Sequence, residues 1–236
     1  MTRECIVLAG GLGTRLRSAV ANKPKCMAPI GDQPFLYYLL QYLHRQGIDH
    51  TVLSLGYLSE QVISWCESTP LPLRISFTVE PEPLGTGGGI MHALPAVAGN
   101  DLFIVNGDTF FDVDLTAFCT FHQQTGSGLS LALKPMQQFD RYGSIDLDNT
   151  HHIIAFREKQ FCESGLINGG IYLTGKNWLN SLSLPEKFSF EKVVLEPQVT
   201  AGALSGYISD TYFIDIGIPE DYQKAQHDLT ANTAKN

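Results

Sequence analysis

The sequence predicts an α/β fold in a single domain, with a Rossmann-like, mixed and mainly parallel sheet that is flanked by helices. The first half alternates short β-rich runs with amphipathic stretches, which is the rhythm of βαβ units around a parallel sheet. The second half has more strand-like than helix-like runs, so we expect it to extend the same sheet. A chain of 236 residues without an internal repeat or a composition shift fits one large domain better than two.

The expected elements follow from these runs in chain order. In the first half, strands are expected at 5–9, 51–55, 75–79 and 102–105, and helices at 35–46, 59–67 and 89–94. In the second half, one helix is expected at 190–196, and strands are expected at 129–133, 143–147, 153–156, 170–173 and 212–214. We place the domain at residues 1–228 and expect residues 229–236 to form a flexible tail.

Composition and charge argue against several classes of protein. The net charge of −8 disfavours nucleic-acid binding, which needs a basic surface. No apolar stretch reaches the length of a membrane span, so we expect no membrane association. The five cysteines are scattered and lack C-x-x-C spacing, which disfavours a disulfide framework or a zinc site and favours a reducing cytoplasm. His122, His151 and His152 lack metal-ligand spacing and are expected to have core or surface roles.

A glycine-rich loop follows the first expected strand, and cations follow the loop. Gly10, Gly11 and Gly13 allow backbone N–H groups to approach an anion closely. The loop is neither the dinucleotide fingerprint nor the P-loop motif. A glycine cluster alone could be a tight turn with a solvated basic face. The four cations that follow it favour a polyphosphate ligand, and of these we expect Arg15 and Lys25, rather than Arg17 and Lys23, to contact phosphate.

Two aspartates follow strand-like runs and could converge. Asp108 follows the strand expected at 102–105, and Asp215 follows the strand expected at 212–214. In an open α/β sheet, ligands bind beyond the carboxyl ends of the strands. Either aspartate alone would more often be a turn or capping residue. Together, and beside a phosphate loop, they favour a Mg²⁺ site, because this ion takes few carboxylate ligands plus phosphates and waters.

Six motifs, in this order, resemble those of the sugar-nucleotide pyrophosphorylases, which are nucleotidyltransferases with a glycosyltransferase-A-like fold. The resemblance spans nearly the whole chain. The motifs are the loop Leu8-Ala9-Gly10-Gly11-Leu12-Gly13-Thr14-Arg15-Leu16 with the following Pro24-Lys25, then Pro83-Leu84-Gly85-Thr86-Gly87-Gly88, Asn106-Gly107-Asp108, Glu158-Lys159, Asn168-Gly169-Gly170-Ile171-Tyr172 and Asp215-Ile216-Gly217. Cys26 stands where proline is common in the family.

The resemblance implies a role for each matching residue. It implies an enzyme that joins a sugar 1-phosphate to a nucleoside triphosphate with release of pyrophosphate, with Arg15, Lys25 and Asp108 as catalytic residues and with Mg²⁺ on Asp108 and Asp215. The residues that would bind the nucleotide are Leu8, Gly10, Gly11, Gly13, Thr14, Glu80 and Gly85. The residues that would bind the sugar phosphate are Gly143, Glu158, Lys159 and Asn168.

The substrate pair is expected to be GTP and D-glycero-α-D-manno-heptose 1-phosphate. The stretches 139–143, 166–172 and 187–191 are most similar to those of guanylyltransferases that act on this heptose. Glu80 supports guanine, because a carboxylate accepts hydrogen bonds and the guanine edge presents adjacent N–H donors. We also expect that the protein can form a homo-oligomer.

The sequence is also compatible with other functions. A mannose 1-phosphate guanylyltransferase, or a uridylyl- or thymidylyltransferase for another hexose 1-phosphate, shares most of these motifs. A cytidylyltransferase for a non-sugar phosphate shares the glycine-rich start, although the Glu158-Lys159 pair favours a sugar. A non-catalytic regulatory protein that binds sugar nucleotides is the reading outside enzymes, and the presence of Arg15, Lys25 and both aspartates argues against it.

Overall fold

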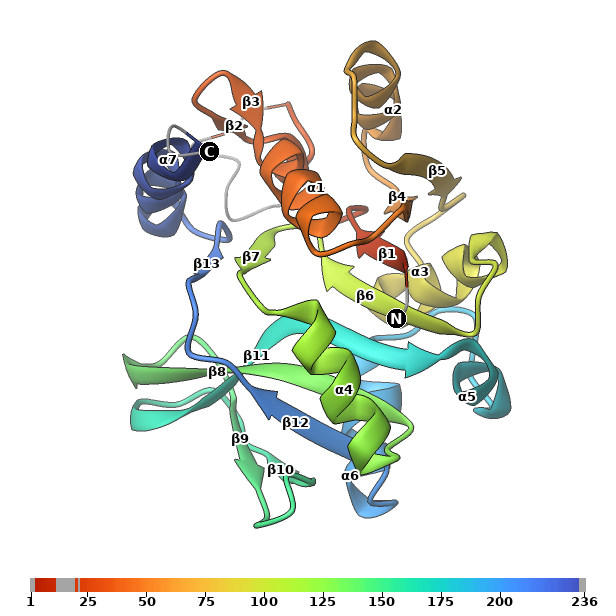
Figure 1. Ribbon diagram of the computed structural model, residues 1–236, viewed down its shortest axis with the longest axis vertical. Helices are drawn as coiled ribbons and strands as arrows, with labels where there is room; N and C mark the ends of the chain where they lie inside the picture. Colours follow the sequence, from red (N-terminus) through yellow and green to blue (C-terminus); the bar gives the residue numbers. More distant parts are fainter. Residues whose placement is uncertain (1–2, 12–19, 21, 234–236) are drawn as a thin grey trace.

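The computed structural model describes residues 3–11, 20 and 22–233 and contains one large mixed sheet with helices on both faces (Figure 1). The sheet has nine strands, in the order β10 (Ile153–Phe156), β9 (Ser144–Leu147), β11 (Cys162–Gly175), β6 (Asp101–Asn106), β1 (Glu4–Leu8), β4 (His50–Leu55) and β5 (Arg74–Val79). The other two are β8 (Leu129–Phe139), which lies beside β11, and β12 (Leu204–Ile208), which lies beside β8. This confirms the predicted α/β class and the expectation that the second half extends the sheet of the first. No helix within the described ranges is long and apolar enough to cross a membrane.

The parallel part of the sheet comes from the first half of the chain. Its strands are β1 (Glu4–Leu8), β4 (His50–Leu55), β5 (Arg74–Val79) and β6 (Asp101–Asn106), with β1 paired to β4 and β6, and β4 paired to β5. All six residues of β4 are buried. Strands covered on both faces need apolar side chains in both directions, which explains the continuous apolar runs of β1 and β6.

Two buried clusters lie on opposite faces of this part of the sheet. Val7, Leu53 and Val105 pack on one face with α1 (Phe35–Arg45), α2 (Ser59–Ser68) and α4 (Leu115–Thr125). Their chain neighbours Ile6, Val52 and Ile104 pack on the other face with α3 (Gly85–Ala93) and with residues near 190–195. The alternation is the side-chain period of a strand, and it fixes the two helical layers.

Strand β11 (Cys162–Gly175) joins the two parts of the sheet. It runs antiparallel to β6 through Ile171–Gly175 and antiparallel to β8 (Leu129–Phe139) along most of its length. Its register shifts between Asn168 and Tyr172, where Gly170 has φ +75°, a bulge that a glycine permits. The remaining strands of this part are β9 (Ser144–Leu147), β10 (Ile153–Phe156) and β12 (Leu204–Ile208), and β12 pairs with β8 in parallel.

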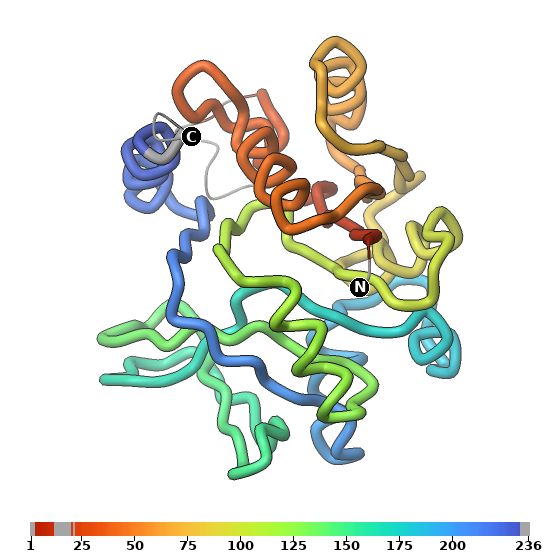
Figure 2. The backbone as a smooth tube through the Cα atoms, viewed as in Figure 1, coloured from red at the N-terminus to blue at the C-terminus, as the bar shows by residue number. Residues whose placement is uncertain are grey.

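Short elements complete the molecule around the sheet. They are η2 (Lys25–Met27), β2 (Pro29–Ile30), β3 (Gln33–Pro34), η3 (Leu94–Ala96), β7 (Thr109–Phe111), α5 (Lys176–Ser181), the π-helix η4 (Glu191–Leu195), α6 (Glu196–Thr200), β13 (Phe213–Asp215) and α7 (Pro219–Thr233). Figure 2 shows α7 beside the β2–β3 hairpin, and the Tyr222 hydroxyl donates to the Pro29 carbonyl at 2.5 Å.

The structure differs from the sequence prediction in several elements. Helix α7 continues past residue 228, the domain end expected from the sequence, and Leu229 within it is 3% exposed. The sequence did not predict α4, β12 or α7. The helix expected at 89–94 begins at Gly85, and the helix expected at 190–196 is a π-helix that continues into α6.

A chain of buried polar side chains connects α4 to β8 and β12 and predicts a pH dependence of stability. His122 Nδ1 lies 2.7 Å from Ser130 Oγ, which lies 2.7 Å from Ser205 Oγ. Burial lowers the pKa of His122, and Asp101 opposes this only in part. In the unfolded chain this histidine has an ordinary pKa of about 6.5, so it binds a proton more tightly than in the folded protein. The stability that neutral His122 contributes is therefore present above that pKa and is lost as the pH falls through the lower pKa of the folded state.

We therefore expect the free energy of unfolding to fall between pH 7.5 and pH 5.5, and to fall less in His122→Gln. Urea unfolding of both proteins at the two pH values measures the difference. His227→Gln is the matched control, because the His227 side chain is 87% exposed. An identical pH dependence for the wild type and His122→Gln would contradict the assignment.

Candidate active site

A cavity lies where the four parallel strands end, as a ligand site in an open α/β sheet should. Its volume is about 660 Å³. The lining contains residues that follow each parallel strand: Gly10 and Gly11 after β1, Gly56 and Tyr57 after β4, Glu80–Pro83, Gly85 and Thr86 after β5, and Gly107 and Asp108 after β6. Lys25, Glu191 and Gly217 complete this wall from other parts of the chain.

The structure brings both predicted metal-binding aspartates to one lysine. Asp108 lies between β6 and β7, and β13 pairs with β7 so that Asp215 stands opposite Thr109. Lys25 Nζ lies 2.5 Å from Asp108 Oδ2 and 3.4 Å from Asp215 Oδ1. The Gly217 amide donates to Asp215 Oδ1 at 2.7 Å. Residues far apart in sequence therefore form one compact group of charges. Lys25 and Asp108 line the cavity, whereas Asp215 contacts Lys25 but is not itself among the lining residues.

The two carboxylates are close enough to affect one another. Burial raises the pKa of Asp215, the Asp108 carboxylate raises it further, and Lys25 and the Gly217 amide oppose both effects. A cation beside Asp215 opposes both effects, because it favours the charged form of the carboxylate. In this structure the ammonium group of Lys25 is that cation.

The part of the glycine-rich loop that the structure describes lies at the cavity. Gly10 and Gly11 line it, whereas Gly13, Thr14 and Arg15, together with the surface candidate Arg17, lie outside the described residues. The loop is held by the Ala9 amide, which donates to the Ser54 carbonyl at 2.9 Å. A Cβ at Gly107 would lie 2.6 Å from the Leu8 carbonyl oxygen, so only glycine allows β1 and the Asp108 turn to approach this closely.

The predicted base-reading residues lie together in the same cavity. The Leu84 amide donates to Glu80 Oε2 at 3.0 Å, which fixes the carboxylate. Gly85 has φ +75°, and a Cβ there would lie 2.5 Å from the Phe188 carbonyl oxygen. Glu80 and Gly85 both line the cavity, as does Leu8.

The four residues expected at the sugar phosphate are not part of the described cavity wall. Glu158 and Lys159 are exposed in the connection between β10 and β11, and Gly143 lies against the Arg157 carbonyl, where a Cβ would come within 2.4 Å. Asn168 is closer to the cavity: its Nδ2 donates to the Tyr172 hydroxyl at 2.8 Å. A Cβ at Gly170 would lie 2.7 Å from Asn106 Nδ2, and Asn106 is a lining residue.

Glu191 and Thr86 were missed by the sequence analysis as site residues, and both line the cavity. Thr86 Oγ1 donates to Glu191 Oε2 at 3.0 Å across a sequence separation of 105 residues. No local pattern links positions this far apart. The matching stretch 187–191 was the one available signal, and it did not single out the glutamate.

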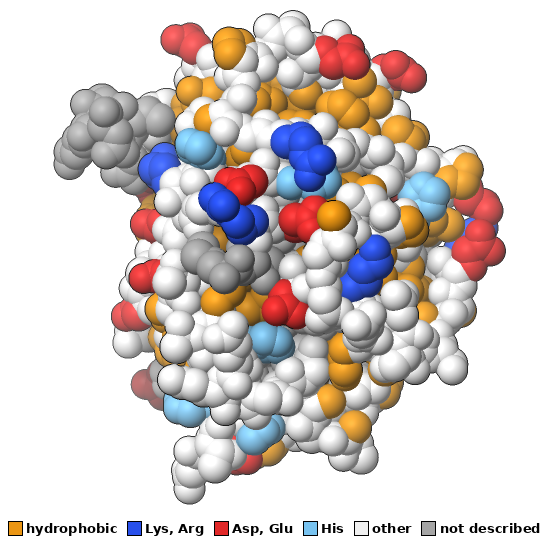
Figure 3. Space-filling model, turned by 45° about the vertical axis from the view of Figure 1, so that its right-hand side comes forward, with side chains coloured by type: hydrophobic (Ala, Val, Ile, Leu, Met, Phe, Trp, Pro, Cys, Tyr) orange, Lys and Arg blue, Asp and Glu red, His pale blue; other side chains and the backbone are white. Residues whose placement is uncertain are grey.

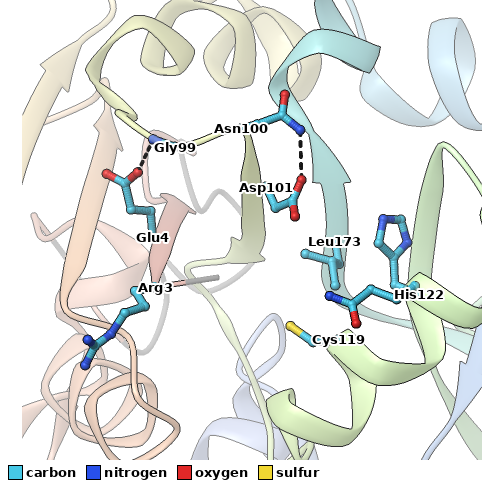
Figure 4. A pocket seen from close by; sticks show the side chains of 9 residues that line it. Arg3, Glu4, Gly99, Asn100, Asp101, Cys119, His122 and Leu173 are labelled. Atoms are coloured by element: carbon cyan, nitrogen blue, oxygen red, sulfur yellow. Dashed lines mark hydrogen bonds between the residues drawn. The ribbon is translucent and has the colours of Figure 1, made fainter. Parts of the chain in front are cut away.

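A second cavity of about 350 Å³ lies at the opposite edge of the sheet, because Glu4 and Asp101 are the first residues of β1 and β6 (Figure 4). Its charged groups already have partners. Glu4 accepts from the Gly99 amide at 2.5 Å and pairs with His50 at 2.7 Å, while Arg3 pairs with Asp49. It lies away from the strand ends that carry the phosphate loop, so the larger cavity is the candidate active site.

Charges of both signs are mixed on one face of the molecule. On the face that Figure 3 shows, Lys and Arg side chains are scattered among Asp and Glu side chains and do not form one basic patch.

Comparison with known proteins agrees with this geometry. The nucleotidyl transferase family matches residues 4–232. The chain is 46% identical to a D-glycero-alpha-D-manno-heptose 1-phosphate guanylyltransferase of Aneurinibacillus thermoaerophilus, over 96% of this chain and 98% of that protein. It is also 46% identical to the protein of that name from Campylobacter jejuni, over 93% and 96% of the two chains. A mannose-1-phosphate guanylyltransferase of Mycobacterium tuberculosis is 30% identical, over 98% of this chain and 66% of that one.

A solved structure is similar over the whole chain. The crystal structure of HddC from Yersinia pseudotuberculosis complexed with GMP-PN superposes with a TM-score of 0.87 at 38% identity, over 97% of this chain and 100% of that one. The family resemblance drawn from the motifs is thereby confirmed. This chain belongs to the nucleotidyl transferase family of enzymes.

Proposed function

We propose that this protein transfers the guanylyl group of GTP to D-glycero-α-D-manno-heptose 1-phosphate and forms GDP-heptose and diphosphate. The observation that carries the proposal is one cavity whose wall contains Glu80, after β5, and Lys25, which pairs with both Asp108 and Asp215. The heptose is supported by the 46% identity, over nearly all of both chains, to guanylyltransferases named for this sugar.

The base end of the cavity suits guanine. Glu80 is held through one oxygen by the Leu84 amide, which leaves the other oxygen as an acceptor of fixed position. A carboxylate can accept from the adjacent N–H donors of guanine, whereas uracil and thymine mix donors with acceptors. Glu80 and Gly85 are therefore the residues that we assign to the base.

Asp108 and Asp215 fit a divalent cation. Their oxygens lie within reach of one positive group, and burial together with mutual repulsion makes a cation between them favourable. Hard carboxylate oxygens that leave room for phosphate are what Mg²⁺ prefers. When bound there, Mg²⁺ would polarise phosphoryl oxygens and neutralise charge on the phosphates.

The protein has to position two anions and offset their repulsion. An oxygen of the sugar 1-phosphate is already anionic, so it attacks the α-phosphorus without a general base; the new O–P bond forms as the bond to the β-phosphate bridging oxygen breaks. Lys25 offsets the repulsion between the phosphates. The amides of Gly10 and Gly11, with Gly13, Thr14 and Arg15 from outside the described residues, take up charge on the leaving diphosphate.

The acceptor sugar occupies the side of the cavity towards β11. We assign Gly143, Glu158 and Asn168 to its hydroxyl groups and Lys159 to its phosphate. Asn168 donates a hydrogen bond to the Tyr172 hydroxyl, and Glu158 and Lys159 are exposed. We also propose that the enzyme works in the cytoplasm, which the five free cysteine thiols support.

A substrate matrix tests the proposed reaction. Diphosphate release is measured with GTP, UTP, CTP, dTTP and ATP against heptose, mannose, glucose and N-acetylglucosamine 1-phosphates, with Mg²⁺ or with EDTA. We expect turnover with GTP and the heptose, and its loss in EDTA. Turnover with another pair would keep the reaction class and replace the substrates. Nucleotide binding without any turnover would instead favour a non-catalytic regulatory protein.

A further inference from the structure

Glu191 is a carboxylate on the cavity wall that the reaction as described so far does not use. Two hydroxyl groups hold it in place: Thr86 Oγ1 donates to Glu191 Oε2 at 3.0 Å, and Ser189 Oγ donates to the same oxygen at 2.8 Å. Thr86 is fixed in turn, because its Oγ1 accepts from the Phe190 amide at 2.9 Å. The carboxylate is therefore oriented before any ligand binds, with its second oxygen available as an acceptor.

The backbone that carries Glu191 is fastened to α3, whose first turn lines the same cavity. The Gly87 amide donates to the Phe188 carbonyl at 3.0 Å, and the Phe188 amide donates to the Leu84 carbonyl at 2.9 Å. Glu191 then begins a π-helix, a rare geometry that is frequent at functional sites. These hydrogen bonds therefore attach the segment that carries Glu191 to the end of α3 that lines the cavity.

The charge of Glu191 shows which ligand groups suit it. Within the part of the chain that the structure describes, Glu191 forms no ion pair; the adjacent Lys192 pairs with Glu196 at 3.0 Å. Lys25 is engaged by Asp108 and Asp215. An anionic wall repels phosphates and accepts hydrogen bonds from neutral hydroxyl groups. A polyol is thus the chemical class that matches it.

The neighbours of Glu191 favour the acceptor sugar over the ribose of the nucleotide. Burial raises the pKa of the Tyr172 hydroxyl, and the charges of Glu191 and, more weakly, Asp108 add to this, so Tyr172 lies near both Asp108 and Glu191. Tyr172 also accepts a hydrogen bond from Asn168, which is assigned to the sugar. Glu196 and, beyond it, Glu158 raise the pKa of Lys192, which places Glu158 near the same segment.

We propose that Glu191 binds hydroxyl groups of the sugar 1-phosphate and helps to select the sugar. This inference rests on the proposed function, because it assigns a further residue to the acceptor side of the same reaction. Glu191 touches the substrate on this account, and Ser189 is a positioning residue that acts through it.

The test is steady-state kinetics of Glu191→Gln, with Glu196→Gln as the matched control. Glu196→Gln makes the same chemical change on the next helix, where the Glu196 side chain is 46% exposed. We expect the kinetics of this variant to match those of the wild type. In Glu191→Gln, the KM for the sugar 1-phosphate should rise by roughly tenfold, the size of one charged hydrogen bond. The KM for GTP and the preference for GTP over 2′-deoxy-GTP should stay as in the wild type.

The other outcomes distinguish a failure of this inference from a failure of the proposed function. An unchanged sugar KM in an active Glu191→Gln enzyme would overturn the inference and leave the proposed function standing. A raised KM for GTP with lost discrimination against 2′-deoxy-GTP would assign Glu191 to the ribose and overturn it as well. A wild type that is silent with every sugar 1-phosphate would refute the proposed function itself, and the inference with it. Should Glu191→Gln fail to fold, Ser189→Ala tests the same point and should raise the sugar KM about threefold.

Discussion

Asp108→Asn is expected to lower kcat by roughly a thousandfold while leaving the KM for GTP within about threefold of the wild type. The change keeps the shape of the side chain and its place beside Lys25, and it removes the negative charge that would hold Mg²⁺ against the phosphates. Interactions that strengthen in the transition state appear in kcat. Steady-state rates of diphosphate release at saturating Mg²⁺ measure the effect.

Asp112→Asn is the control for this experiment. Asp112 lies four positions further on, is exposed and is not part of the described cavity wall, so the same chemical change there should leave kcat unaltered. Should Asp108→Asn turn over as fast as Asp112→Asn, the assignment of Asp108 to a metal would be wrong.

Lys25→Ala is expected to lower kcat/KM by about a hundredfold or more. Lys25 Nζ is the cation that the structure places between Asp108 and Asp215, and its side chain is only 12% exposed. Its removal leaves two carboxylates to repel each other and the incoming phosphates, which added Mg²⁺ offsets only in part. Rates for both substrates over a range of Mg²⁺ concentrations check this.

Lys23→Ala provides the comparison for Lys25→Ala. Lys23 belongs to the same basic stretch but is exposed, and the sequence predicts a surface role for it. Equal losses in the two variants would mean that general positive charge, rather than the position of Lys25 between the aspartates, supports the reaction.

The parts of the fold that could be predicted are those with a strong local pattern. Strands β1, β4 and β6 contribute apolar residues to both faces of the sheet, and β5 alternates apolar and polar residues, so their runs are evident in the sequence. Helix α7 was missed because its sequence is largely polar and only a few side chains, such as Ala225 and Leu229, are buried. Strand β12 is short and contains Gly206, which lies against Leu133 and Leu147.

The candidate site, like the fold, could be predicted from the sequence only in part. That Asp108 and Asp215 converge could be argued from their places after strands, and the structure brings both to Lys25. The means by which they converge, the β7–β13 pairing, has no signal in either short segment. The contact between Thr86 and Glu191 depends on how Phe188 packs against Gly87, and only the folded chain places these residues together.

The most direct test of the central claim is a competition experiment with product identification. The purified protein is incubated with GTP, Mg²⁺ and equal concentrations of D-glycero-α-D-manno-heptose 1-phosphate and mannose 1-phosphate, and the nucleotide sugars are identified by mass spectrometry. The account predicts GDP-heptose as the main product, with one diphosphate released for each molecule formed. A product that is mainly GDP-mannose, or diphosphate release without any nucleotide sugar, would contradict it.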